Sequence, residues 1–470
     1  MPIGQTFATS AAHFTCRASP RLRGSGLILG LLTAPLLAVP QVVKAAPPEA
    51  APPFEGPVLE RQVLIAEVLE RNRTLKGIEA AWQAVAATVP QVEALADPMV
   101  GYEFAPLSIF DEEAFYGHTI RVEQRFPFFG ARRFAAEAAR ARTREAKASL
   151  AVARADLALE ASNLFDDYFV SFRGLEINRR HIALVEGFRQ SAEAQYTVGR
   201  ASQQDPLQAE AELAELLHEQ SIFVSLREQT RARLNGLLHR DPSLPFPPPP
   251  ESLAVDLQHP AKSEALYALA LERRAELEQS AARLEEGRAE TKMAKRSYYP
   301  ELGVMGSYTS MWQGAHRFMA GVTINLPLAL GRRRGAVAEA QARTRQAAES
   351  LAATSDGVRA EVEVARQLVL ETLHQLELFR SRLLPAARDR VAAARAGFET
   401  GKNSFLGLID AERNLRSVEL RWEKNQAELQ RRRAHLNRTV GLLPGQDLPA
   451  AEAHHKETLP ATIPEKGATP

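Results

Sequence analysis

The chain has 470 residues, of which 45% are hydrophobic and 24% are charged, and its formal net charge at pH 7 is +1. This is the composition of a folded protein, and it lacks the basic excess that would favour nucleic acid as a partner. The length suggests two or three domains unless the chain forms an elongated repeat.

The N-terminus has the pattern of an export signal. Arg17, Arg21 and Arg23 precede the apolar run GLILGLLTAPLLAV, and the small residues of VVKAA follow it. The run is too short and too interrupted by proline to make a good membrane-spanning helix. We therefore expect residues 1–46 to be a signal peptide with an undetermined cleavage site, and a disordered apolar leader is the alternative.

Cysteine use and hydropathy limit the fold further. The only cysteine, Cys16, lies ahead of the apolar run, whereas a lipid-modified cysteine would follow it. We expect a mature protein without disulfides that is stabilised by packing alone. No later apolar stretch reaches about eighteen residues, so no transmembrane helix is expected.

The rest of the chain is a tandem duplication with an offset of about 200 residues. YTVGRASQQDPLQAEAEL from Tyr196 corresponds to FETGKNSFLGLIDAERNL from Phe398, and GARR from Gly130 corresponds to GRRR from Gly331. Further pairs at the same offset are Leu69 and Leu271, Leu75 and Leu277, and Asn235 and Asn437. Chance would not hold one register over most of a chain.

The duplication predicts the domain boundaries. We expect a first repeat at residues 47–240, a stiff Pro-rich linker at 241–261 that contains DPSLPFPPPP, and a second repeat at 262–443. A disordered C-terminal tail is expected at 444–470.

Each repeat is expected to contain the same elements in the same order. These are a first helix (about 58–96 and 262–298), a β-hairpin (99–127 and 301–327), a very long helix (about 131–196 and 333–398), a Gly-containing break, and a further helix to about 239 and 440. Pro90 and Pro385 should kink or interrupt their helices. Each very long helix would span roughly 100 Å, which no compact domain of this size accommodates. A coiled-coil spacer is the alternative interpretation of the helices alone.

The strands alternate with a period of two. In the first hairpin His118, Ile120, Val122, Gln124 and Phe126 share one face, and polar or small residues share the other. The length and alternation are typical of transmembrane β-strands, although a soluble hairpin packed on a helix has the same pattern. The export signal and the long helices favour the membrane. Four strands cannot close a barrel, and exposed edges are not tolerated in hydrocarbon, so several chains would have to share one barrel.

The ordered motifs NRTLKG, DPMVGYEF, EQRFPFFGARR, YTVGRASQQDPLQAEAEL, YYPELGV, INLPLALGRRR and FETGKNSFLGLIDAERNL resemble those of TolC-like outer-membrane efflux proteins. EQRFPFFGARR is most similar to the cation-efflux branch. The resemblance implies a mainly α fold with a small β part. Duplicated long helical hairpins would form an α-barrel, and four transmembrane strands per chain would contribute to a trimeric twelve-stranded β-barrel.

The resemblance also implies function and partners. The protein would be the outer-membrane exit duct of a tripartite efflux system. Its partners would be itself as a homotrimer, outer-membrane lipid, a periplasmic membrane-fusion adaptor and an inner-membrane transporter of the resistance-nodulation-division type. The sequence does not separate metal cations, drugs and proteins as exported substrates.

The segment SFLGLIDAERNL resembles the periplasmic gate of that family, where two acidic positions three residues apart form carboxylate rings. Asp410 matches one position, and Gly407 stands at the other, so the number of rings stays open. A ring of three carboxylates would favour cations. Alternatively, Asp410 pairs with Arg413 or Arg416 on a solvated helix face.

Two further groups of residues are site candidates. Gly199 and Gly401, each three positions after an aromatic (Tyr196 and Phe398), are expected to form positive-φ turns at the helix tips. The resemblance implies that an adaptor or transporter docks there, and a turn without partner contact is the alternative.

Pro127 and Pro327 are expected to end strands, and Gly130 and Gly331 to allow the bend into the long helices. The neighbouring arginines would face the inner leaflet, the tunnel mouth or solvent: Arg132, Arg133, Arg332, Arg333 and Arg334.

No enzyme chemistry is evident in the sequence. It contains no catalytic constellation, no phosphate-binding glycine loop and no spaced metal-ligand motif, so we expect no catalytic residue, cofactor or metal site. His454 and His455 lie in the polar tail and are expected to be disordered rather than a metal site. A periplasmic coiled-coil adaptor or scaffold is the alternative function, and an envelope hydrolase lacks the residues it would need.

Overall fold

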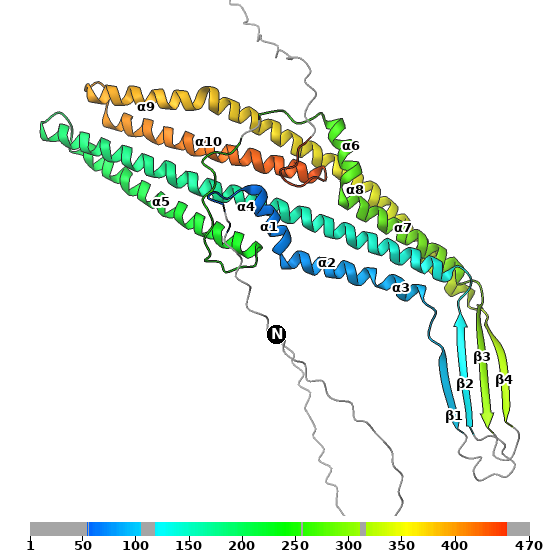
Figure 1. Ribbon diagram of the computed structural model, residues 1–470. Coiled ribbons are helices and arrows are strands. Elements are labelled where there is room, and N and C mark those ends of the chain that lie inside the picture. Colours follow the sequence, from blue (N-terminus) through cyan, green and yellow to red (C-terminus); the bar gives the residue numbers. More distant parts are fainter. Residues whose placement is uncertain (1–53, 55, 105–117, 255–256, 311–315, 449–470) are drawn as a thin grey trace, which may run out of the picture. The chain divides into compact units, whose positions relative to one another are not determined.

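The computed structural model describes residues 54, 56–104, 118–254, 257–310 and 316–448 (Figure 1), all within one compact unit, Ala50–Pro470. The expected signal peptide and the histidine pair of the tail lie outside the described residues. No helix among the described residues has both the length and the apolar character needed to cross a bilayer.

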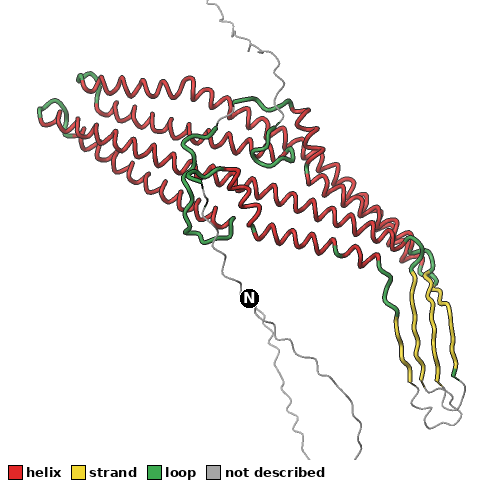
Figure 2. The backbone as a smooth tube through the Cα atoms, in the orientation of Figure 1, coloured by secondary structure: helices red, strands yellow, loops and turns green. Residues whose placement is uncertain are grey.

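The described chain is mainly helical with one small sheet (Figure 2). The first repeat contains α1 (Arg61–Arg71), α2 (Arg73–Ala86), α3 (Thr88–Glu93), β1 (Met99–Phe104), β2 (His118–Phe126), α4 (Ala131–Thr197) and α5 (Gln204–Leu237). The second contains α6 (Ser263–Arg273), α7 (Ala275–Arg296), β3 (Glu301–Ser310), β4 (Arg317–Asn325), α8 (Leu330–Leu378), a π-helical turn (Phe379–Leu383), α9 (Leu384–Glu399) and α10 (Phe405–Thr439). Both repeats therefore place a hairpin between a first group of helices and a long helical hairpin, although α3 has no counterpart in the second repeat and the long helix is divided only there.

The single first helix expected in each repeat is wrong, because the backbone leaves the helical region at one equivalent position in both. Asn72 has φ −61° and ψ 119°, and its side chain accepts a hydrogen bond from the Leu75 N–H at 3.0 Å, so it ends α1 and caps α2. Arg274, which is Asn72's counterpart in the second repeat, has φ −75° and ψ 121° and separates α6 from α7.

The prolines interrupt their helices as expected. In a continuous helix Pro90 would clash with the carbonyl of Ala86, and α2 ends at Ala86. Pro385 lies at the start of α9, directly after the π-helical turn. The long helix of the second repeat is therefore divided, whereas α4 runs unbroken for 67 residues, about 100 Å.

The four strands form one antiparallel sheet in the order β1-β2-β3-β4. Within each repeat a hairpin forms, and β2 pairs with β3 to join the two repeats. The register places apolar side chains of all four strands on one face, for example Val100 opposite Val122 and Val304 opposite Val322. Val100 is 72% exposed and Val322 is 68% exposed, so no other part of the described chain covers this face.

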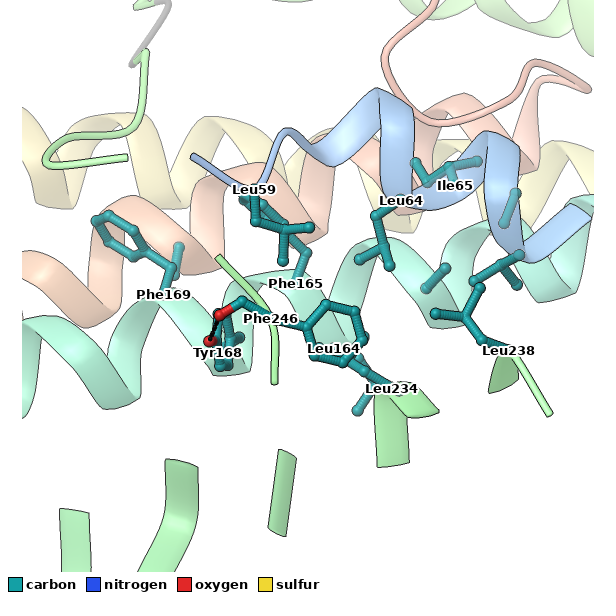
Figure 3. Close-up of a cluster of buried hydrophobic side chains, with 14 of the residues drawn as sticks. Leu59, Leu64, Ile65, Leu164, Phe165, Tyr168, Phe169, Leu234, Leu238 and Phe246 are labelled. Atoms are coloured by element: carbon teal, nitrogen blue, oxygen red, sulfur yellow. Dashed lines mark hydrogen bonds between the residues drawn. The ribbon is translucent and has the colours of Figure 1, made fainter. Parts of the chain in front are cut away.

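Helix α4 is the centre of the helical packing, since it contacts α1, α2, α3, α5, α7 and α10. One core cluster joins α1 and α4 through Leu64, Phe165 and Phe169, all nearly fully buried (Figure 3). Burial of such a side chain stabilises the fold by about 1.5–3 kcal/mol.

The Pro-rich linker is not a free spacer, because it packs on this core. Phe246 is buried beside Leu164, and Tyr168 donates a hydrogen bond from its hydroxyl to the Phe246 carbonyl at 3.4 Å (Figure 3). The Leu59 N–H donates to the Pro248 carbonyl at 2.8 Å. The proline run therefore adds a covering layer to the first repeat.

Two equivalent asparagines fold back the chain that follows each repeat. Asn235 donates to the carbonyls of Pro242 and Leu244 at 3.0 and 2.9 Å, and Asn437 donates to those of Leu443 and Gln446 at 3.2 and 2.8 Å. The start predicted for the disordered tail is therefore too early. Residues 444–448 are described and packed, and residues 449–470 lie outside the described residues.

Candidate functional site at the helix tips

The turns that join α4 to α5 and α9 to α10 use glycines in the left-handed region. Gly199 has φ 73° and Gly401 has φ 72°, so the predicted positive φ is confirmed at both positions. The N–H of each glycine donates to the carbonyl of the aromatic residue three positions earlier, at 2.9 Å to Tyr196 and 3.0 Å to Phe398. These bonds satisfy carbonyls that the helix ends would otherwise leave unpaired.

The two tip aromatics differ in accessibility. Tyr196 is 44% exposed, whereas Phe398 is 5% exposed and lies edge-on to Phe405, with ring centroids 5.2 Å apart. Phe398 therefore belongs to the core that holds the second tip together. Of the two aromatics, Tyr196 is the one available to a partner.

The first turns of α10 present Asp410 outward. Ser404 caps the helix, and its hydroxyl accepts a hydrogen bond from the Gly407 N–H at 3.3 Å. Leu408 and Ile409 are buried, while Gly407 and Asp410 are exposed. The spacing of apolar residues on α10 thus turns the two candidate gate positions away from the core of the chain.

The alternative ion pairs of Asp410 do not form among the described residues. Arg413 instead binds Glu212 of α5 at 2.5 Å, and Arg416 approaches Glu212 at 3.7 Å and Glu219 at 3.4 Å. The hydrogen bond with Glu212 is the main cause that raises the pKa of Arg413. The Asp410 carboxylate acts on Arg413 only through its charge, without a direct ion pair, and its side chain remains exposed.

A buried ionic network lies directly behind this surface. His181 of α4 is 4% exposed, and its Nδ1 lies 2.5 Å from Glu412 while its Nε2 lies 3.2 Å from Glu419. A neutral imidazole has only one N–H donor, so both contacts are hydrogen bonds only when the ring carries two protons. Glu412 is fully buried and follows Asp410 by two residues on α10. The network therefore joins α10 to α4.

Sequence reasoning missed this network. Its signal was present in α10, because Glu412, Arg416 and Glu419 follow one another at the spacing of a single helix face. That face also contains Leu408, which is buried. Charged residues that share a helix face with buried apolar residues indicate buried ion pairs rather than a solvated surface.

The strand–helix junctions of the two repeats are built differently. β2 ends before Pro127, and Gly130, with φ 89°, redirects the chain into α4. Gly331 has no such role, because α8 begins at Leu330 and the glycine lies inside the helix. The bend at Pro327 is made instead by two successive tight turns, in which Leu328 N–H donates to the Leu326 carbonyl and Leu330 N–H to the Leu328 carbonyl.

Within the ranges that the structure describes, no three His, Cys, Asp or Glu side chains are grouped to hold a metal ion. The charged side chains at the tips instead pair with each other across helices or face outward.

Residues 266–442 match the family model described as outer membrane efflux protein. A curated relative, the cobalt-zinc-cadmium resistance protein CzcC of Cupriavidus metallidurans, is 24% identical over 306 residues, which cover 62% of this chain and 70% of the relative.

Solved structures show the same fold. The outer-membrane channel OprN aligns with a TM-score of 0.68 at 21% identity, covering 81% of this chain and 89% of that chain. The outer membrane protein VceC of Vibrio cholerae aligns with a TM-score of 0.70 at 17% identity, covering 82% of this chain and 96% of that chain.

Proposed function

We propose that this chain, which belongs to the outer membrane efflux protein family, is the outer-membrane exit duct of a tripartite efflux system. The observation that carries this function is the four-stranded sheet with one apolar face, continuous with α4, a helix about 100 Å long. A scaffold that worked wholly in water would have to cover that face, and no described helix does so.

The protein is proposed to work as a homotrimer. The outer edges of β1 and β4 have no strand partner within the described chain, and an unpaired edge is not tolerated in hydrocarbon. Three chains would contribute twelve strands to one closed barrel, with the apolar face toward outer-membrane lipid. Their helices would surround a tunnel through the periplasm.

The helix tips are proposed to dock the other two components, a periplasmic membrane-fusion adaptor and an inner-membrane transporter of the resistance-nodulation-division type. The exposed Tyr196 and the outward turns at Gly199 and Gly401 support this role. Phe398 would act there only indirectly, since it is buried behind the second turn.

Asp410 is proposed to form the gate. In a trimer, three copies of this outward carboxylate would surround the axis and produce a negative constriction that favours cations. Gly407 supplies no second carboxylate, so one acidic ring is proposed.

The exported substrate is proposed to be a small molecule or a metal cation. The name of the relative from Cupriavidus metallidurans, a cobalt-zinc-cadmium resistance protein, supports cations. A deletion strain tested against cobalt, zinc, copper and hydrophobic drugs would separate these classes.

Pore formation tests the duct directly. Protein purified from outer membranes should insert into planar lipid bilayers and give discrete cation-selective conductance steps. Recovery of the protein in the periplasmic fraction, with no conductance and a monomeric mass, would support the adaptor or scaffold function instead.

A further inference from the structure

A hydrophobic cavity lies where the sheet meets α4. Its volume is about 590 Å³, within the range of small-molecule sites. One wall is the apolar sheet face, with Phe126 of β2, Leu302 and Val304 of β3, and Val322 of β4. The opposite wall is the loop that contains Phe128 and Phe129. Because the cavity lies at the junction of β2 and α4, we refer to it as the junction groove.

The groove opens on the uncovered side of the sheet. Phe129 is 84% exposed and Val304 is 51% exposed, although both line the groove. Phe128 is held in place by stacking on Tyr299, with ring centroids 4.4 Å apart. The walls are therefore fixed by the fold, while the apolar surface of the groove lacks an occupant from the described chain.

Arg132 is the charged residue of the lining. Its guanidinium donates one hydrogen bond to the Glu93 carbonyl, and a guanidinium has five N–H donors, so several remain for a ligand. A planar cation at the end of an apolar groove is complementary to an anionic amphiphile whose charge is a phosphate.

The two segments that lead from the sheet into the long helices are basic. The segments 126–136 and 326–338 contain five arginines and no acidic residue. In both α4 and α8 the arginines fall near the helix start, where the helix dipole disfavours positive charge, and neither first turn contains an acidic residue. An anionic partner would compensate this unfavourable arrangement.

We infer, resting on the proposed function, that the junction groove binds one anionic phospholipid of the inner leaflet per protomer. An acyl chain fills the groove along β2–β4, and the headgroup phosphate binds Arg132. The groove is at the helix end of the strands, which the proposed duct places at the periplasmic side, and aromatic and basic residues are typical of that boundary.

Native mass spectrometry of the detergent-purified oligomer tests this inference. The probes are phosphatidylglycerol and phosphatidylcholine with identical acyl chains. Wild type should retain phosphatidylglycerol preferentially, up to one molecule per chain. Arg132→Gln should weaken this binding roughly tenfold, the effect of losing a hydrogen bond to a charged group. Arg132→Lys, which keeps the charge, should restore part of it.

Matched variants separate the groove from general lipid contact. Arg133→Gln removes the same charge one residue away, from a side chain that is 80% exposed, pairs with Glu137 and lies outside the groove lining, and it should weaken binding far less than Arg132→Gln. Val304→Trp should fill the groove and abolish retention, whereas Val100→Trp, on the same apolar face but outside the groove lining, should not.

Three results would overturn the inference. These are equal retention of the two lipids, equal effects of the Arg132 and Arg133 substitutions, and displacement of phosphatidylglycerol by inorganic phosphate, which would indicate a plain anion site. Conductance in planar bilayers is measured on the same preparations. Normal pores without lipid selectivity would refute the groove alone, while the absence of pores in wild type would refute the proposed function.

Discussion

The protonation of His181 connects the contact between α4 and α10 to pH. Burial alone would lower the pKa of His181, but hydrogen bonds with Glu412 and Glu419 outweigh it and raise the pKa above its ordinary value of 6.5. The stability that His181 contributes is fully present below its pKa in the unfolded chain. It is lost as the pH rises through its higher pKa in the folded protein.

Glu419 shows the opposite shift. Its hydrogen bond from His181 is the main cause that lowers its pKa below the ordinary 4.5, and Arg180 and Arg388 approach it at 3.7 and 4.0 Å. The stability that Glu419 contributes is fully present above pH 4.5, its ordinary pKa. It is lost as the pH falls through the lower pKa that the residue has in the folded protein. The contact is therefore most stable between about pH 4.5 and 6.5.

Replacing His181 with Gln should reduce the loss of thermal stability that occurs as the pH rises above neutral. In wild type, deprotonation leaves a buried carboxylate without its charged donor, which costs about 1.5–3 kcal/mol. Thermal unfolding of the purified protein should therefore occur at a lower temperature at about pH 9 than at about pH 6, and the difference should shrink in His181→Gln.

His218→Gln is the matched control, because His218 is exposed on α5. This variant should keep the wild-type difference between the two pH values. An unchanged difference in His181→Gln would mean that other groups produce the alkaline loss.

At the scale of elements, the same substitution to alanine should have opposite effects on stability at a turn glycine and at a helix glycine. Gly401 needs positive φ, while Gly331 lies in the first turn of α8, and an added Cβ would meet no atom within 4 Å at either site. The difference is therefore one of backbone conformation rather than space.

Gly401→Ala should destabilise the protein by about 1–2 kcal/mol because alanine disfavours the left-handed region. Gly331→Ala should be neutral or stabilise it by up to about 1 kcal/mol because alanine favours a helix. Thermal unfolding of the two variants side by side measures both. Equal destabilisation would show that contacts between chains, rather than backbone angles, set the requirement at these glycines.

The elements differ in how far the sequence predicts them. The hairpins follow from period-two alternation and the interruptions at Pro90 and Pro385 from proline chemistry, because both signals are local. The break at Arg274 has no such signal. Arginine is a good helix former, so tertiary packing decides that break.

The candidate site divides in the same way. The positive φ at Gly199 and Gly401 was readable, because few residues other than glycine adopt it. The pairing of His181 with Glu412 was not, since it joins α4 to α10 across 231 positions of sequence. The spacing on α10 indicates a buried charge but does not say which residue pairs with it. Gly331 shows the limit of analogy between repeats: it matches Gly130 in sequence, yet α8 begins before it and α4 begins after its counterpart.

For the whole molecule, function depends on surfaces that one chain leaves unsatisfied. The sheet has two free edges and an uncovered apolar face, and Asp410 points away from its own core. Each of these features is unfavourable or without a contact in a monomer and would acquire a partner in the proposed trimer.

Asp410→Asn should make the closed channel leakier and weaken its block by divalent cations, because it removes the negative charge of the proposed ring. Single-channel recording with and without added divalent cations measures both effects. Asp356→Asn removes the same charge from an exposed position of α8, a helix that does not form the turn between α9 and α10, and it should behave as wild type. Unchanged conductance and block in Asp410→Asn would refute the gate.

The π-helical turn before Pro385 has a mechanical consequence. A helix with a widened turn and a missing N–H bends at lower energy than an unbroken helix. We therefore expect the helical segment formed by α8 and α9 to bend more easily than α4. The two repeats therefore differ in the stiffness that we expect of their long helices. Substitutions around Pro385 should therefore change the stiffness of the second helical hairpin and leave that of the first unchanged.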